Sequence, residues 1–217
     1  MKAPAAPTAT LPGRQASGLS RWLNDRLPFG LAAVALLASL LLPYWSMTLR
    51  APQYPGGLRI AIYLGPQGLV GDVAEVNGLN HYIGMMPLED AARLERAVAP
   101  YGVAALALAA AMAALIRRRW TTVLSLGIVA FPVIFLADLA YWLWYYGNHL
   151  DPTAPLRGAI RPFTPPVLGV GRVGQFVVVA DFGPGLYLAF TAALLAAAGA
   201  VLRWRALSQA RKPAGGL

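Results

Sequence analysis

Long apolar runs alternate along the chain with polar, turn-rich segments, and this pattern predicts four membrane-spanning helices. A helix needs about 20 apolar residues to cross the ~30 Å hydrocarbon core of a bilayer. The predicted boundaries are a disordered or interfacial tail over 1–28, spans over 29–49, 98–116, 121–146 and 184–202, a turn over 117–120, connecting segments over 50–97 and 147–183, and a tail over 203–217. The expected fold class is an all-α membrane protein built on a four-helix bundle.

The two connecting segments predict a small structured cap on the bundle. Leu58–Leu64 and Phe176–Ala180 are rich in residues that favour strands, and turn residues lie close to both. Pro87–Val98 begins with Pro and carries Glu89 and Asp90 in its first turn, as an amphipathic helix does. We therefore expect an external cap of two loops that contains short strands and one short amphipathic helix.

Composition supports the membrane class, since 58% of the residues are hydrophobic and only 12% are charged. The net charge of +9 does not indicate a nucleic-acid partner, because the basic residues lie beside the apolar runs rather than on one folded face. Eleven of them fall in the two tails and the 117–120 turn, whereas seven fall in the connecting segments. By the positive-inside rule, both termini of this multi-pass protein are cytoplasmic and the cap is external. The absence of Cys excludes disulfides and thiolate metal sites.

Candidate metal ligands lie in the polar stretch Asn77–Met86, which the pattern places in an external loop. His81, Met85 and Met86 supply an imidazole and two thioethers, and thioethers select the soft Cu(I) ion. The second histidine, His149, lies on the same predicted side and is followed by Asp151. These residues predict a copper site. The alternative is that they pack the loop onto the bundle, with His149 at the negative end of a helix.

Asp138 lies inside the third predicted span, where a carboxylate is costly unless it faces protein, water or a cation. It therefore indicates a proton relay, a metal ligand or a polar contact to a partner. A structural hydrogen bond explains it equally well. The sequence has no hydrolase motif and no phosphate-binding loop, so we predict no catalytic residues and no enzymatic activity.

Several motifs together resemble a family of small bacterial membrane proteins that is associated with gene clusters for copper enzymes, notably nitrous oxide reductase maturation. The resemblance covers roughly residues 40–185, and the order of Asn148 and His149 is reversed relative to the family pattern. The motifs that carry it are Ala51-Pro52-Gln53-Tyr54-Pro55, Asn77 to Met85, Asp138, Asn148-His149-Leu150-Asp151-Pro152 and Phe163-Thr164-Pro165-Pro166. The resemblance implies the bacterial inner membrane and a role in copper handling or assembly.

Three functions remain open on the sequence alone. The leading hypothesis is a non-enzymatic accessory that binds or delivers copper, or helps to assemble an external copper enzyme. The second is a docking subunit of a larger respiratory or oxygenase complex, in which a protein partner binds the cap and no metal is held. The third is a small-solute or proton pathway through Asp138. An open cavity that reaches Asp138 favours the third, whereas converging imidazole and thioether groups favour the first.

Overall fold

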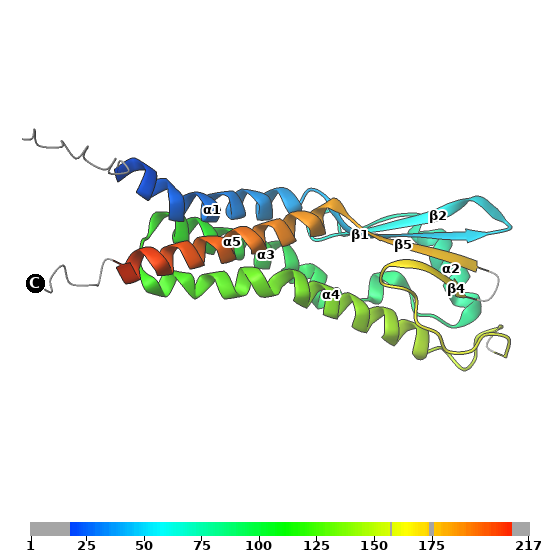
Figure 1. Ribbon diagram of the computed structural model, residues 1–217. Helices are drawn as coiled ribbons and strands as arrows, with labels where there is room; N and C mark the ends of the chain where they lie inside the picture. Colours follow the sequence, from blue (N-terminus) through cyan, green and yellow to red (C-terminus); the bar gives the residue numbers. More distant parts are fainter. Residues whose placement is uncertain (1–17, 157, 174–175, 210–217) are drawn as a thin grey trace, which may run out of the picture.

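The computed structural model describes residues 18–156, 158–173 and 176–209, which form a helical bundle with a β-sheet at one end (Figure 1). The helices are α1 (Gly18–Ser39), α2 (Val73–Ile83), α3 (Arg93–Leu115), α4 (Leu124–Asn148) and α5 (Pro184–Gln209), with 3-10 turns η1 (Leu88–Asp90) and η2 (Arg119–Thr122). The strands are β1 (Pro43–Ala51), β2 (Tyr54–Tyr63), β3 (Leu69–Gly71), β4 (Gly169–Val173) and β5 (Phe176–Phe182). The start of α1 and the end of α5 lie at one end of the bundle, called here the terminal end, and the sheet lies at the other, the sheet end.

The prediction of an all-α fold is wrong. The described residues form a five-stranded antiparallel sheet in the order β3-β2-β1-β5-β4 together with the five helices, so the fold mixes α and β structure. The first predicted span, 29–49, accounts for most of the error, because α1 ends at Ser39 and the apolar run continues as strand β1. Pro43 cannot extend a helix, and the aromatic and β-branched residues after it favour a strand.

The prediction of four spanning helices is wrong for the same reason. Among the described residues, three helical segments are long and apolar enough to cross a membrane, namely α3, η2 with α4, and α5. The amphipathic helix predicted over Pro87–Val98 is instead the short turn η1 followed by the start of α3 at Arg93. Of the predicted tails, residues 1–17 and 210–217 lie outside the described part, while 18–28 belong to α1 and 203–209 to α5.

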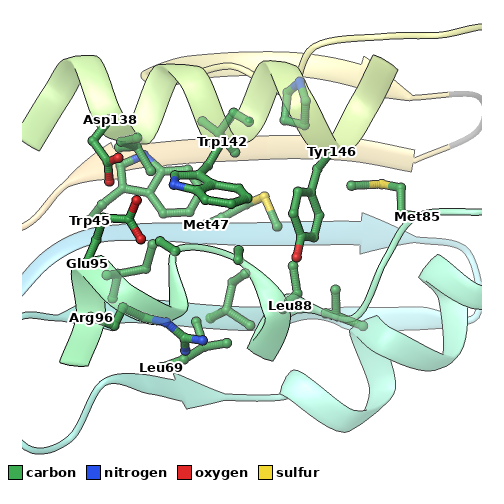
Figure 2. Close-up of a pocket in the computed structure, with 18 of the residues that line it drawn as sticks. Trp45, Met47, Leu69, Met85, Leu88, Glu95, Arg96, Asp138, Trp142 and Tyr146 are labelled. Carbon is green, nitrogen blue, oxygen red and sulfur yellow. The ribbon is translucent and has the colours of Figure 1, made fainter. Parts of the chain in front are cut away.

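The sheet is joined to the bundle through two adjacent, antiparallel connections. Strand β1 follows α1, strand β5 leads into α5, and the two strands pair from Trp45↔Phe182 to Arg50↔Val177. At the junction, a Cβ on Gly183 would overlap the carbonyl oxygen of Pro43. The segment before α5 therefore approaches the start of β1 as closely as two backbones allow. Trp45 and Met47 project from β1 toward the sheet-end half of α4 (Figure 2). The sheet therefore has a fixed position relative to α4.

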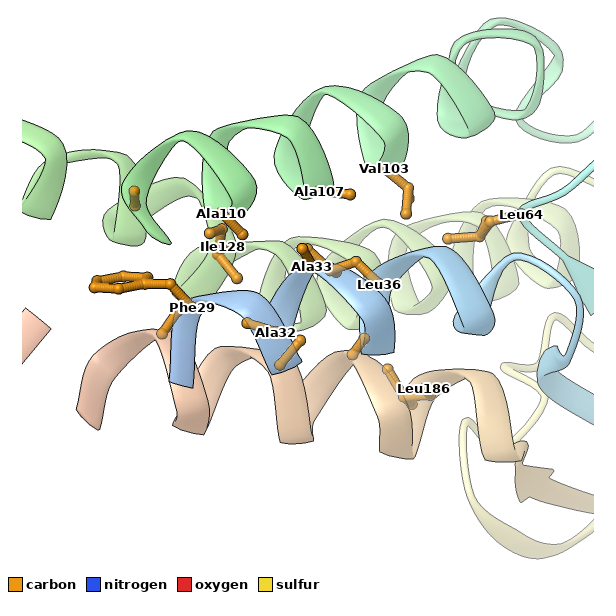
Figure 3. Packing of buried hydrophobic residues seen from close by; sticks show 14 of the residues in the cluster. Phe29, Ala32, Ala33, Leu36, Leu64, Val103, Ala107, Ala110, Ile128 and Leu186 are labelled. Atoms are coloured by element: carbon orange, nitrogen blue, oxygen red, sulfur yellow. The ribbon is translucent and has the colours of Figure 1, made fainter. Parts of the chain in front are cut away.

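Small side chains let the helices of the bundle pack closely (Figure 3). Ala107 and Ala110 of α3 and Ala192 and Ala196 of α5 are buried in a core with Phe29, and the same core includes Leu36 and Ile128. Alanine at these positions lets neighbouring backbones approach, which is the usual basis of helix association in lipid. The core places α1 against both α3 and α5, although α1 itself is not one of the apolar candidates for a span.

A buried ion pair closes the bundle near its terminal end. Arg203 of α5 is fully buried, and its Nε donates to Asp25 Oδ2 of α1 over 3.2 Å. Its Nη1 donates to Thr121 Oγ1 of η2 over 2.6 Å, and Arg117 Nε reaches the same Asp25 oxygen over 3.1 Å. The predicted boundaries placed Asp25 and Arg203 in tails, whereas here they tie α1, α5 and the α3–α4 connection together.

Candidate functional site

A cavity of about 380 Å³ lies between one face of the sheet, helix α2, the start of α3 and the sheet-end half of α4 (Figure 2). The volume falls within the range of small-molecule binding sites. Alternate residues of the strands point into it because side chains of a strand alternate between faces. These include Met47 and Leu49 of β1, Ile60 and Ile62 of β2, and Val178 of β5. The sheet therefore supplies an apolar wall.

Two carboxylates lie at one end of this cavity and point toward one another, Asp138 of α4 and Glu95 of α3 (Figure 2). Within the part of the chain that the structure describes, neither forms a salt bridge. The indole N–H of Trp142 lies near Asp138 without reaching hydrogen-bond geometry. Arg96, the next residue of α3, also lines the cavity, but its guanidinium points away from the carboxylate pair (Figure 2). Its Nη2 donates to the carbonyl of Glu89, and within the described residues its buried Nε has no hydrogen-bond partner. We call Asp138, Glu95 and Trp142 the polar mouth.

The cavity opens between α3 and α4. Val98 of α3 and Ile134 of α4 both line it, and 52% and 62% of their surfaces are exposed. Glu95, one turn before Val98 on the same helix, is exposed as well. The opening therefore lies between two helices that are each apolar and long enough to cross a membrane. A molecule that enters here passes between these helices rather than through the sheet.

The opposite end of the cavity is closed by the contact of α2 with η1 and α4. Tyr146 of α4 donates its hydroxyl to the carbonyl of Pro87 over 2.9 Å. Asn77 of α2 accepts from the amide of Leu88 over 2.9 Å and donates to Glu89 Oε2 over 2.6 Å. The backbone amide of Glu89 itself and the Asn77 side chain hydrogen-bond its carboxylate, and together they hold its pKa below the ordinary value of 4.5.

Asn80 lies one turn further along α2 and also lines the cavity. Only 6% of its surface is exposed, and its side-chain Nδ2 has no hydrogen-bond partner among the residues that the structure describes. A buried donor without a partner is unfavourable by about 1–3 kcal/mol. The wall that α2 contributes to the cavity thus includes a buried amide whose N–H lacks an acceptor in the described part of the chain.

The predicted copper ligands are distributed differently. The stretch around His81 is helical rather than a loop, since α2 runs to Ile83, and the exposed imidazole packs edge-on against Tyr82. Met85 lines the cavity, whereas Met86 does not. In the described residues, no three His, Cys, Asp or Glu side chains group closely enough to hold a metal ion.

His149 and Asp151 satisfy local hydrogen bonds. His149 follows the last residue of α4, and its Nδ1 donates to the carbonyl of Tyr145 over 2.9 Å. Its imidazole also stacks on the Tyr145 ring, with 4.1 Å between the centroids. Asp151 Oδ1 accepts from both the amide and the hydroxyl of Thr153 over 2.7 Å. Both side chains therefore have structural contacts where they lie.

The backbone nevertheless brings the two predicted segments together. The amide of Asp151 donates to the carbonyl of Gly84 over 2.8 Å, and that of Leu156 donates to Tyr82 over 2.9 Å. Gly84 has φ +85°, and a Cβ there would lie 2.9 Å from the Asp151 nitrogen, so the close approach requires glycine. The loop after α4 is therefore docked on the end of α2.

Among the residues that the sequence predicts to be functional, Asp138 lies in the polar mouth of the cavity. Sequence reasoning missed Glu95, Arg96, Trp142 and Asn80, which come from three different helices. The only available signal was a pair of opposite charges, Glu95 and Arg96, immediately before an apolar run. No protein-family model matches the chain, and no curated protein matches its sequence.

Proposed function

We propose that this protein is anchored in a membrane and binds an amphipathic small molecule of the lipid class in the cavity beneath its sheet. The observation that carries the proposal is the combination of an apolar cavity, a polar mouth and an opening between two apolar helices. A water-soluble substrate would gain little from such walls. A molecule already dissolved in the bilayer reaches the opening by lateral diffusion.

The proposed orientation places the terminal end in the cytoplasm and the sheet outside, in the inner membrane of a bacterium. Basic residues concentrate at the terminal end, with Arg117, Arg118 and Arg119 between α3 and α4 and Arg205 near the end of α5. The polar mouth contains Glu95 just before the apolar part of α3, which is the expected level of the outer headgroups. The cavity then extends from that level into the external sheet.

The apolar wall alone does not select one lipid. Burial of a methylene group from water is favourable by about 0.8 kcal/mol, but a chain that leaves the bilayer exchanges one apolar surrounding for another. Selective binding must therefore come from the polar mouth. The protein would hold a lipid-class molecule partly above the membrane, in a position to be transferred to an external partner.

The test compares two neighbouring residues of α4. Ile134 lines the opening and is 62% exposed, whereas Val133 is 60% exposed and does not line the cavity. We expect Ile134→Trp to narrow the opening and Val133→Trp to leave it unchanged. Native mass spectrometry of protein purified in mild detergent should show one bound amphiphile on the wild type and on Val133→Trp, and a loss of at least about fivefold on Ile134→Trp.

Two results would count against this function. One is a wild-type protein that carries no amphiphile and takes up none when lipid extract is added. The other is equal occupancy in both tryptophan variants. Because both positions are exposed on the same helix, a difference between them does not arise from loss of folding, and circular dichroism checks this directly.

A second candidate function is copper handling at the cap. It is favoured by the backbone contacts that bring the segment containing His81, Met85 and Met86 beside the segment containing His149 and Asp151. Copper analysis of purified wild type, His81→Ala and Met85→Ala tests it. Metal above background in wild type and a loss in both variants would support this function, and no copper in wild type would exclude it.

A further inference from the structure

We propose that the face of the sheet turned away from the cavity docks an acidic segment of an external protein partner. This surface, called here the outer sheet face, follows from the alternation of side chains along each strand. Met47 and Leu49 of β1 line the cavity, so Thr48 and Arg50 lie on the opposite face. A Cβ on Gly57 of β2 would meet both the Thr48 and the Arg50 side chain, which places these two on one side. The proposal does not depend on what the cavity holds.

Three arginines from three different strands gather on the outer sheet face. Arg50 of β1 pairs with Val177 of β5, and Val177 pairs with Arg172 of β4, so these residues form one row across the sheet. Arg59 of β2 pairs with Thr48, two residues before Arg50 on β1. Arg50 and Arg59 are therefore diagonal neighbours, about 7–8 Å apart at the backbone, and Arg172 lies two strands or roughly 10 Å from Arg50. One partner segment can contact all three guanidinium groups.

The positive charge of this face is only partly offset. All three arginines are exposed, and within the described residues none of them forms a salt bridge. Asp72, at the edge of the sheet, accepts from the backbone amide of Arg59 over 2.7 Å and so offsets part of the charge there. Asp181 pairs with Ser46, four residues or about 13 Å along β1 from Arg50. Since the Debye length is about 8 Å in physiological salt, Asp181 leaves the charge of Arg50 and Arg172 uncompensated.

Aliphatic side chains occupy the space between the arginines. Val177 and Val179 of β5 lie on this face, and so does Val170 of β4, which pairs with Val179. Val170 is 71% exposed, a large fraction for a β-branched residue inside a strand. Protein–protein interfaces combine an apolar centre with arginine in this way. The face therefore offers both apolar contact and charge to a partner.

The size of the face determines what kind of complex it can form. The four strands β2, β1, β5 and β4 at about 4.8 Å spacing, and six residues at about 3.3 Å each, give a surface of roughly 20 Å by 20 Å. This is about 400 Å², half of the ~800 Å² that each partner contributes to a standard stable interface. The face is suited to a single extended or helical segment, bound transiently and weakened by salt.

Other anionic partners fit this face less well. A nucleic acid or a polyphosphate would match the arginines but would lay further charge over the valines between them. A bilayer surface does not reach the face, because the strands run along the long axis of the bundle and extend beyond its end (Figure 1). Carboxylates that flank apolar side chains satisfy both features, since the planar guanidinium group binds a carboxylate through two hydrogen bonds.

Binding of a designed acidic peptide tests the proposal. A labelled twelve-residue peptide that repeats Glu-Val-Glu-Thr is titrated with the purified full-length protein in dodecyl maltoside at low ionic strength, and fluorescence anisotropy reports binding. An exposed ion pair changes affinity about two- to fivefold. The triple variant Arg50→Gln, Arg59→Gln and Arg172→Gln should therefore bind the peptide at least about tenfold more weakly than the wild type.

A matched control removes the same charge elsewhere. Arg118, Arg161 and Arg205 are exposed and lie outside the outer sheet face, so their triple substitution by Gln should weaken binding less than about twofold. A charge reversal adds a gain that unfolding cannot produce. The double variant Arg50→Glu and Arg172→Glu should bind a peptide that repeats Lys-Val-Lys-Thr at least about fivefold more tightly than the wild type does.

The weaker binding of the sheet variant together with the gain of the reversed variant would support the proposal. Three results would overturn it: no binding of the acidic peptide to the wild type, an equal loss in both triple variants, or no gain in the reversed variant. Tighter binding of an oligodeoxythymidylate with the same number of charges, lost in the sheet variant, would also overturn it, because the face would then be a site for nucleic acid.

Discussion

The buried ion pair between Asp25 and Arg203 offers a quantitative test of how the bundle is held together. Arg203 is fully buried and Asp25 is 2% exposed, so neither charge is stabilised by water. The guanidinium donates to Asp25, to Thr121 Oγ1 and to the carbonyl of Ile116, and it lies 4.7 Å from the centroid of the Phe29 ring. The perturbations are Asp25→Asn, Arg203→Met and the double variant.

The expected magnitudes follow from which charge is left behind. Asp25→Asn leaves the guanidinium buried without its counter-ion, and removing one partner of a buried pair costs about 3–5 kcal/mol. Because the guanidinium keeps its contacts with Thr121 and Phe29, we expect this variant to lose about 3 kcal/mol of stability, the lower end of that range. Arg203→Met leaves Asp25 with Arg117 and removes the charged hydrogen bonds, which costs about 2 kcal/mol. The double variant leaves no uncompensated charge, so we expect about 3 kcal/mol rather than the sum of about 5 kcal/mol.

Reversible unfolding in mixed micelles, titrated with sodium dodecyl sulfate and followed by circular dichroism, measures these differences. Arg205→Met is the matched control, because Arg205 is an exposed arginine on the same helix and should change stability by less than about 0.5 kcal/mol. Strict additivity of the two single variants would refute the reasoning, since it would mean that the charges do not interact. A cost below about 1 kcal/mol for Asp25→Asn would show that water reaches the pair.

The contacts of helix α2 with its neighbours predict two further outcomes. Gly84→Ala should destabilise the protein by about 1–3 kcal/mol in the same unfolding assay, because φ +85° is unfavourable for Ala and the added Cβ meets Asp151; an unchanged midpoint would contradict the docking of the loop on α2. The depressed pKa of Glu89 contributes stability that is present above its unfolded pKa and lost as pH falls through the lower folded pKa. Asn77→Ala should therefore make stability less sensitive to acid between about pH 6 and pH 3, and a pH profile identical to wild type would show that this hydrogen bond is not formed.

The apolar helices were predictable from the sequence, and the sheet was not. The predicted spans over 98–116, 121–146 and 184–202 correspond to α3, η2 with α4, and α5, because a long uncharged run has few alternatives to a helix. The run over 29–49 contains both a helix and a strand. Since β1 is a central strand with neighbours on both sides, it carries no clear alternation of polar and apolar residues, and only Pro43 marks the change.

The candidate site was predictable only in part, because it depends on how α3 and α4 are positioned relative to one another along the bundle axis. Asp138 is conspicuous in an apolar run, but its partner Glu95 is distant in the sequence and lies in a charged segment where a carboxylate is ordinary. The two meet because α3 begins at the level where α4 passes Asp138. Conversely, His81 and His149 are conspicuous as the only two histidines, yet both rings contact neighbours on their own chain segment.

The most direct test of lipid binding in the cavity is photocrosslinking. The protein is reconstituted in vesicles of phosphatidylethanolamine that contain a small fraction of the same lipid with a diazirine on its acyl chain, irradiated, and mapped by peptide mass spectrometry. Lipid binding in the cavity predicts adducts on residues of the sheet that line the cavity, foremost Met47, Ile62 and Val178, and their loss in Ile134→Trp. Adducts confined to exposed helix positions such as Leu126 and Leu194, with none on the cavity walls, would contradict it.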